Sequence, residues 1–129
     1  MDAGSLNKVN VNTETLEISF ELNGRAAVIK PTWRAISDIQ NDLGYGMVPL
    51  AVRIQSKNFG LHELTTIILR GIIATRPQIK PKYEEIAEEV FKAGILSPVI
   101  IEATTKFCEL ALSGGKKAEG KLPAGAEKN

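Results

Sequence analysis

The sequence contains few of the residues on which catalytic and metal sites depend. Its 129 residues include one cysteine and one histidine, so the chain forms no internal disulfide, and these two residues alone do not make a zinc site. Aromatic residues make up 5% of the chain, and the formal net charge is +1. Nucleic-acid binding usually brings more positive charge, with aromatic side chains for base stacking. The composition therefore predicts no nucleic-acid partner.

Long hydrophobic runs are missing as well. The apolar runs are short, such as 26–29, 67–69 and 99–101, whereas a membrane-spanning helix needs about 20 apolar residues. The first residues are mostly polar and include Asp2 and Lys8, which is unlike a signal peptide. Together with the lone cysteine, these features predict a soluble protein of a reducing cytosol, without a membrane partner.

A β-hairpin is the clearest local pattern. Apolar and polar residues alternate from Leu16 to Asn23, as in a half-buried strand. Asn23-Gly24 predicts a two-residue turn, because both residues accept the positive φ angles of a type I′ turn. The preceding segment, 1–13, is rich in small polar residues and is expected to be a flexible arm. Counting outward from the turn pairs Leu22 with Arg25, Phe20 with Ala27, and Ile18 with Ile29.

Helical patterns fill the rest of the domain. Thr32 and Ser97 are suitable N-caps, and Gly44 is a natural helix end. The sequence predicts an α+β fold in which the hairpin packs on a bundle of about five short helices, over 14–113. A disordered tail is expected at 114–129, because it holds one large apolar residue. The predicted helices cover about 33–43, 49–57, 61–74, 82–93 and 98–112, with Trp33 on the apolar spacing of the first, Phe91 inward in the fourth, and Leu112 on the apolar face of the last.

The reactive side chains have structural explanations. Cys108 falls on the apolar face of the last predicted helix, where a free cysteine behaves as a small hydrophobic residue. His62 lies in the first turn of a predicted helix and is expected to be exposed. Four glutamates of the fourth helix are typical of a solvated acidic face. The four glutamates are Glu84, Glu85, Glu88 and Glu89. The sequence therefore predicts a non-enzymatic protein with no catalytic residue, metal or cofactor.

The third helix is apolar on more than one side. Its main stripe is Leu64, Ile67, Ile68 and Ile72, and two further apolar residues lie outside that stripe. Such a helix is either central to the core, which is favoured in a small domain, or offers a second face to a partner. Apolar residues around the second helix would extend that face. The candidate partner-binding residues are Met47, Val48, Phe59, Leu69 and Ile73.

The order of these elements resembles a known family. The hairpin, the helix after it and the two later helical segments are similar to the small tail proteins of gene transfer agents and related prophages, which are classed with the phage tail assembly chaperones. The resemblance covers roughly 14–113 and does not extend to the arm, the tail or the connector at 75–82. It is carried by Phe20-Glu21-Leu22-Asn23-Gly24, Lys30-Pro31-Thr32, Ile36, Ile39 and Leu43-Gly44, 61–71 and 83–94.

The resemblance implies a role in tail assembly. Such chaperones are thought to bind the tape measure protein, a long helical and partly apolar chain, and to recruit the tail tube subunits that replace them. It is also compatible with association between copies of the chain. Some of them are made in a longer form by ribosomal slippage; Gly114-Gly115-Lys116 fits a slippery site and equally an ordinary flexible tail.

Two other functions remain open at this point. A structural tail component that stays in the particle would assemble into rings, often by extending a sheet between neighbours. A small protein-binding or ligand-binding module unrelated to phage would show an apolar pocket with a few convergent polar groups.

Overall fold

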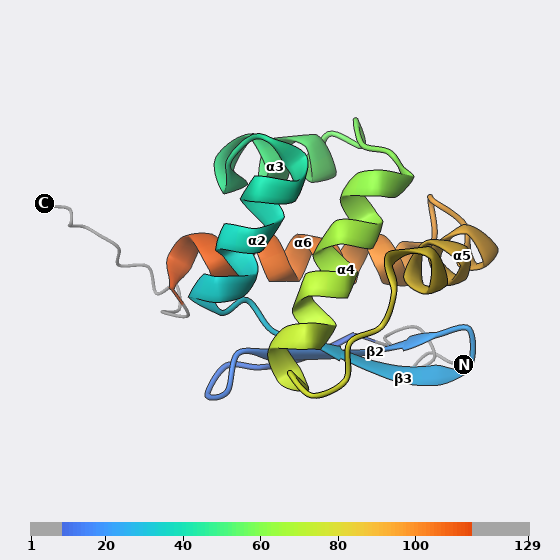
Figure 1. Ribbon diagram of the computed structural model, residues 1–129. Coiled ribbons are helices and arrows are strands. Elements are labelled where there is room, and N and C mark those ends of the chain that lie inside the picture. The colour runs from blue at the N-terminus through green and yellow to red at the C-terminus, as the bar shows by residue number, and fades with distance from the viewer. Residues whose placement is uncertain (1–8, 115–129) are drawn as a thin grey trace, which may run out of the picture.

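Three short strands precede five helices in the computed structural model, which describes residues 9–114 (Figure 1). The fold is α+β, as the sequence predicts. The strands form one antiparallel sheet in the order β1-β2-β3. The elements are β1 (Asn10–Asn12), β2 (Glu17–Leu22), β3 (Arg25–Ile29), α2 (Trp33–Leu43), α3 (Met47–Gln55), α4 (Leu61–Thr75), α5 (Tyr83–Ala93) and α6 (Pro98–Ser113).

The hairpin of β2 and β3 has the predicted turn and register. Asn23 and Gly24 both have positive φ angles, 52° and 84°, which a type I′ turn requires. All three predicted pairs occur in the ladder. Because side chains alternate across a strand, this register puts one apolar set on the core side of the sheet. That set is Ile18, Phe20, Leu22, Ala27 and Ile29, all buried.

Strand β1 corrects the prediction of a flexible arm over 1–13. Asn10–Asn12 pair with β2, and Val11 lies opposite Ile18. The connection to β2 is stabilised locally, since the Asn12 side-chain oxygen accepts hydrogen bonds from the backbone N–H groups of Glu14 and Thr15. Val9 to Asn12 alternate between apolar and polar residues, but this run has the shortest length that indicates a strand, and the small polar residues around it favoured an arm. Residues 1–8 lie outside the described part of the chain.

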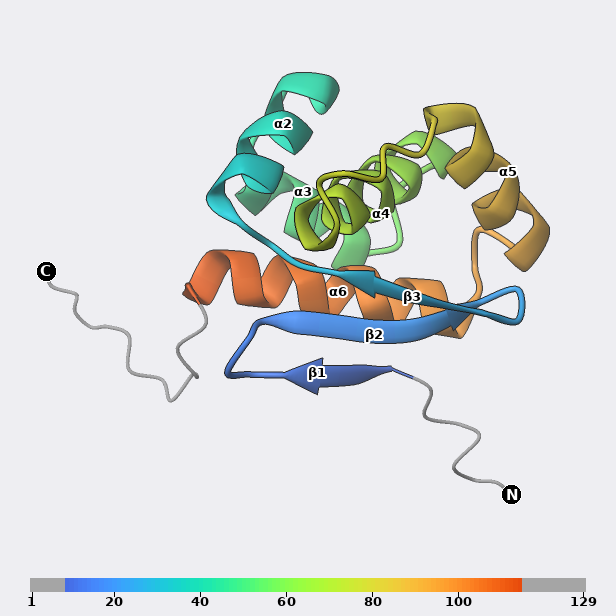
Figure 2. The same cartoon turned by 60° about the horizontal axis from the view of Figure 1, so that its bottom comes forward.

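The five helices lie on one side of the sheet (Figures 1 and 2). Helix α6 packs along β2, and α4 packs on β3 and also contacts α2, α5 and α6. Seven of the fifteen residues of α4 are buried, so the interpretation of this helix as the centre of the core is confirmed. The large side chains of the core include Ile67, Ile68 and Phe107, each fully buried.

A glycine sets the distance between α4 and β3. A Cβ atom built on Gly71 would lie 2.5 Å from Ile29 Cβ, closer than two carbon atoms pack. The Gly71 carbonyl oxygen accepts a hydrogen bond from the backbone N–H of Lys30, at 3.2 Å. The helix therefore rests directly on the strand backbone, and glycine is required by close approach.

Helix ends follow the predicted signals, but three side chains that were predicted to lie on apolar helix faces point outward. Thr32 and Ser97 accept capping hydrogen bonds, and α3 begins two residues before Pro49. Trp33, predicted on the apolar spacing of its helix, is 74% exposed, and Phe91, predicted to point inward, is 68% exposed. Leu112 is half exposed as well.

These side chains are exposed because helical spacing identifies an apolar stripe but does not show how much of that stripe the neighbouring elements cover. In α2 the buried residues are Ala35 and Ile39, and in α5 they are Ile86 and Val90. The predicted disordered tail, 114–129, lies outside the described residues except for Gly114, which ends α6. Within 9–114, no helix combines the length and the apolar character needed to cross a bilayer.

Candidate functional site

The five predicted partner-binding residues do not form one surface. Met47 and Leu69 are buried in the core, so the folded chain does not present them to a partner. Phe59 and Ile73 are half-buried, and Val48 is exposed. Leu69 was expected to lie on a second face of α4, but that face is covered by neighbouring helices. Of the five residues, Val48 and Ile73 each lie on a surface that includes other apolar side chains.

Val48 belongs to an apolar surface on α3 and α6. Val48 and Val52 lie on the side of α3 opposite the buried residues Leu50 and Ile54, and Ala51 lies half-buried between the two sides. Val48 and Val52 are 62% and 57% exposed. Ala51 lines a shallow cavity of about 120 Å³ together with Leu112 of α6. We call Val48, Ala51, Val52 and Leu112 the α3–α6 surface.

The sequence analysis missed Val52 and Leu112. Val52 follows Val48 by four residues, so both fall on one face of a helix. This spacing was visible in the sequence, because Leu50 and Ile54 already account for the buried face. Leu112 carried no such signal, since it continues the apolar pattern of α6 and yet is half exposed.

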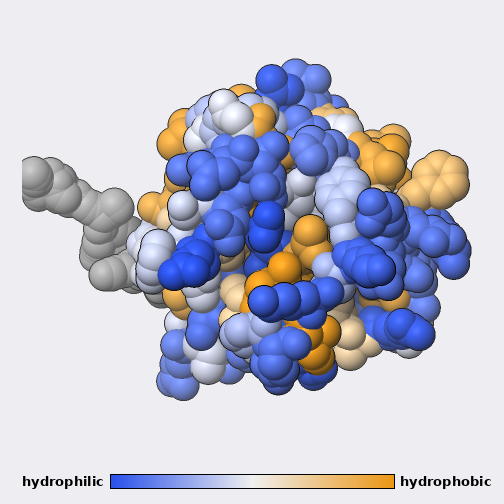
Figure 3. All heavy atoms as spheres, viewed as in Figure 1, coloured by the Kyte–Doolittle hydropathy of each residue, from blue (hydrophilic) through white to orange (hydrophobic). Residues whose placement is uncertain are grey.

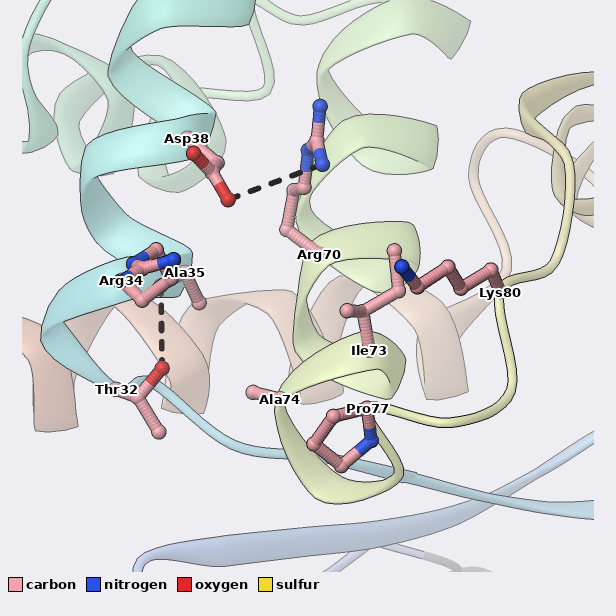
Figure 4. Close-up of a pocket in the computed structure, with 9 residues that line it drawn as sticks. All are labelled: Thr32, Arg34, Ala35, Asp38, Arg70, Ile73, Ala74, Pro77 and Lys80. Carbon is pink, nitrogen blue, oxygen red and sulfur yellow. Dashed lines mark hydrogen bonds and ion pairs between the residues drawn. The ribbon is translucent and has the colours of Figure 1, made fainter.

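Ile73 lies in a groove between α2 and α4 that is closed at one end by the connector after α4 (Figure 4). Its volume is about 520 Å³. Figure 3 shows apolar residues at the centre of this face, over the C-terminal half of α4, with hydrophilic residues around them. We call this cavity the α2–α4 groove; its lining is Thr32, Arg34, Ala35, Asp38, Arg70, Ile73, Ala74, Pro77 and Lys80.

Two of the three cations in the α2–α4 groove have no acidic partner among the described residues. Arg70 is neutralised, because its guanidinium donates to both carboxylate oxygens of Asp42, at 2.8 and 3.2 Å, and lies 3.8 Å from Asp38. The hydrogen bond to Asp42 raises the pKa of Arg70 further. Arg34 stacks on Trp33, and Lys80 reaches back toward α4 from the connector (Figure 4). The groove therefore has an apolar floor and a positive rim.

A second polar cluster joins α3 to α4. The Tyr45 hydroxyl donates to Glu63 Oε2 at 2.7 Å, Glu63 Oε1 accepts the Gly60 N–H at 2.7 Å, and Arg53 lies 3.9 Å from Glu63. Burial and the Glu63 carboxylate raise the pKa of Tyr45 to about 12. Burial alone would raise the pKa of Glu63, but the hydrogen bonds from Tyr45 and Gly60 lower it overall. These groups satisfy one another and hold two helices together.

The reactive side chains occupy the predicted positions. Cys108 is buried, and burial together with Glu109 raises the pKa of its thiol to about 12, so the thiol is protonated at neutral pH. His62 is exposed and its Nδ1 lies 2.8 Å from the Tyr83 hydroxyl. Across 9–114, no group of three acidic, histidine or cysteine side chains converges to hold a metal ion.

Comparison with known proteins identifies no homologue of this chain. No family model, curated protein or solved structure matches this chain.

Proposed function

We propose that this chain is a non-enzymatic assembly chaperone of the phage-tail type. It binds the tape measure protein, keeps that long helical chain soluble, and is displaced as tail tube subunits assemble. The observation that carries the proposal is the α3–α6 surface, where Val48 and Val52 are exposed on α3, and Ala51 and Leu112 line a shallow cavity between α3 and α6. An apolar stripe of a helical partner packs into such a surface by helix-in-groove contacts.

The affinity expected from this surface is modest. Each exposed valine contributes about 1–2 kcal/mol when it is fully covered, by the usual area estimate. One copy therefore binds weakly, and several copies along one long chain hold it through avidity. Weak individual contacts also let tube subunits replace the copies one at a time without ATP.

Paired substitutions on the α3–α6 surface test the proposal. In cells producing particles, the tagged chain is expected to capture a long tape-measure-like protein, and Val48→Glu with Val52→Glu is expected to reduce this capture at least tenfold, or about 1.4 kcal/mol. Leu96→Glu is the matched control, because Leu96 is 68% exposed and precedes the opposite end of α6. Equal capture by both variants would remove the α3–α6 surface from the proposal.

A structural tail component is the second candidate, because the sheet is larger than the sequence predicted. Strand β1 pairs with β2 on one side only, and its other edge carries no strand among residues 9–114. An unpaired edge is where a neighbouring subunit adds a strand. This candidate requires the chain to be a stoichiometric part of finished particles.

A further inference from the structure

The outer face of α5 combines negative charge with an exposed aromatic ring. Glu84, Glu88 and Phe91 follow one another at four and three residues, so they lie on one side of the helix. Phe91 is 68% exposed. Glu88 has only a 4.0 Å pair with Lys92, and Glu84 has no ion pair with another described residue.

The other two glutamates of α5 have local roles. Glu85 Oε1 accepts the backbone N–H of Lys82 at the start of the helix, at 3.1 Å. Glu89 Oε1 accepts a hydrogen bond from the Asn23 side chain in the hairpin turn, at 2.7 Å. The outer pair, Glu84 and Glu88, thus remains available to a partner together with Phe91.

The α2–α4 groove has the opposite character. Ile73 and Ala74 provide an apolar floor, while Arg34 and Lys80 provide positive charge that no described carboxylate neutralises. A volume of about 520 Å³ leaves room for an aromatic side chain and part of the helix that carries it. The groove and the outer face of α5 are therefore complementary in charge, and each supplies an apolar element for the other.

We propose that the outer face of α5 in one copy of this chain docks into the α2–α4 groove of a second copy. Phe91 covers the floor at Ile73, and Glu84 and Glu88 face Arg34 and Lys80. The contact does not form within one copy, because Ile86 and Val90 hold α5 against its own core. The groove and the outer face of α5 are different surfaces, so the interface is heterologous. Each copy that is added therefore leaves one free groove and one free α5 face at the two ends of the assembly.

Such an interface is small and depends on charge. One helix face in one groove is a smaller contact than a standard stable interface of roughly 800 Å² per partner, so we expect an association that is weak and depends on concentration. The exposed charges are screened at high ionic strength, and salt should therefore weaken it. The inference is independent of the proposed function, because it uses neither the α3–α6 surface nor a tape measure protein.

Two complementary variants test this interface in the full-length chain by light scattering or sedimentation. The groove variant carries Arg34→Glu and Lys80→Glu, and the helix variant carries Phe91→Asp. The wild-type chain is expected to exceed its 14.0 kDa monomer mass as concentration rises, and to return to it at high salt. Each variant alone is expected to stay monomeric, and an equimolar mixture to form a one-to-one dimer, since each variant keeps one intact half of the interface.

Three outcomes would overturn the inference. The first is a wild-type chain that stays monomeric up to about 1 mM, which leaves an acidic helix of another protein as the occupant. The second is self-association that both variants retain, and the third is a mixture of folded variants that remains monomeric. Leu96→Asp is the control and should associate like the wild type. If a variant fails to fold by circular dichroism, single changes of Arg34→Ser and Phe91→Ser replace it.

Discussion

Helices α4 and α3 are both predominantly apolar, yet they use their side chains differently. Helix α4 is contacted by α2, α5, α6 and β3, and its apolar residues are buried on several sides. Helix α3 packs mainly on α6, so Leu50 and Ile54 are buried while Val48 and Val52 face outward. The apolar character of a helix therefore does not by itself identify a binding surface. A helix offers an apolar surface only where neighbouring elements leave its apolar side chains uncovered.

The largest expected effect tests the buried helix. Ile68→Ala in α4 should lower the free energy of unfolding by about 2–5 kcal/mol, because it removes a fully buried side chain and leaves a cavity. Denaturant unfolding followed by circular dichroism measures this change. A loss of less than about 1 kcal/mol would mean that the packing around α4 is looser than described.

The contact between α4 and β3 gives the next largest effect. Gly71→Ala should destabilise the chain by about 1–3 kcal/mol, because the new Cβ would lie 2.5 Å from Ile29 Cβ. The intrinsic preference of alanine for helix acts in the opposite direction and is worth about 1 kcal/mol. Combining Gly71→Ala with Ile29→Ala should recover little of this loss, because alanine at position 29 keeps the Cβ atom that the new side chain meets. A thermal melt in which Gly71→Ala is neutral would contradict the close approach.

A smaller, pH-dependent effect tests the connection between α3 and α4. Glu63→Gln should lower stability by about 1 kcal/mol at neutral pH, because the charged acceptor for Tyr45 is lost. The pKa of Glu63 is lowered in the folded chain, so this contribution is present above the usual value of about 4.5 and is lost as pH falls through the folded pKa. Melts over a pH series should show the two proteins converging at acidic pH. A constant difference across the series would count against this assignment.

The smallest effect tests the exposed helix. Val52→Ala in α3 should change the free energy of unfolding by no more than about 0.5 kcal/mol, because the side chain is 57% exposed. Val90→Ala is the matched control, since it removes the same atoms from a fully buried position. The control should cost several times more in the same denaturant measurement. Equal losses for the two valines would remove the distinction between covered and exposed helices.

Local signals predicted much of the fold. The Asn23-Gly24 turn fixed the strand register, and Thr32, Gly44 and Ser97 marked helix ends through interactions within a few residues. Strand β1 was not predicted, because the alternation from Val9 to Asn12 is very short and the strand exists by pairing with β2. The backbone of β1 is paired with another strand, and local sequence signals do not show this pairing.

The candidate surfaces were harder to predict than the fold. Met47 and Leu69 looked available because helical spacing does not show which elements cover a face. Arg34 is far from Ile73 and Lys80 in the sequence, and only the packing of α2 beside α4 brings it to their groove. The outward position of Phe91 depends in the same way on how α5 is seated on the core.

The proposed function requires the chain to act on the tail during assembly without becoming part of the finished particle. The most direct measurement is affinity purification from cells during particle production, with quantitative mass spectrometry of the soluble lysate and of the finished particles. The account predicts a long tape-measure-like chain bound in the lysate and no copies of this protein in the particles. A stoichiometric amount of the protein in finished particles would contradict the account and identify a structural tail component.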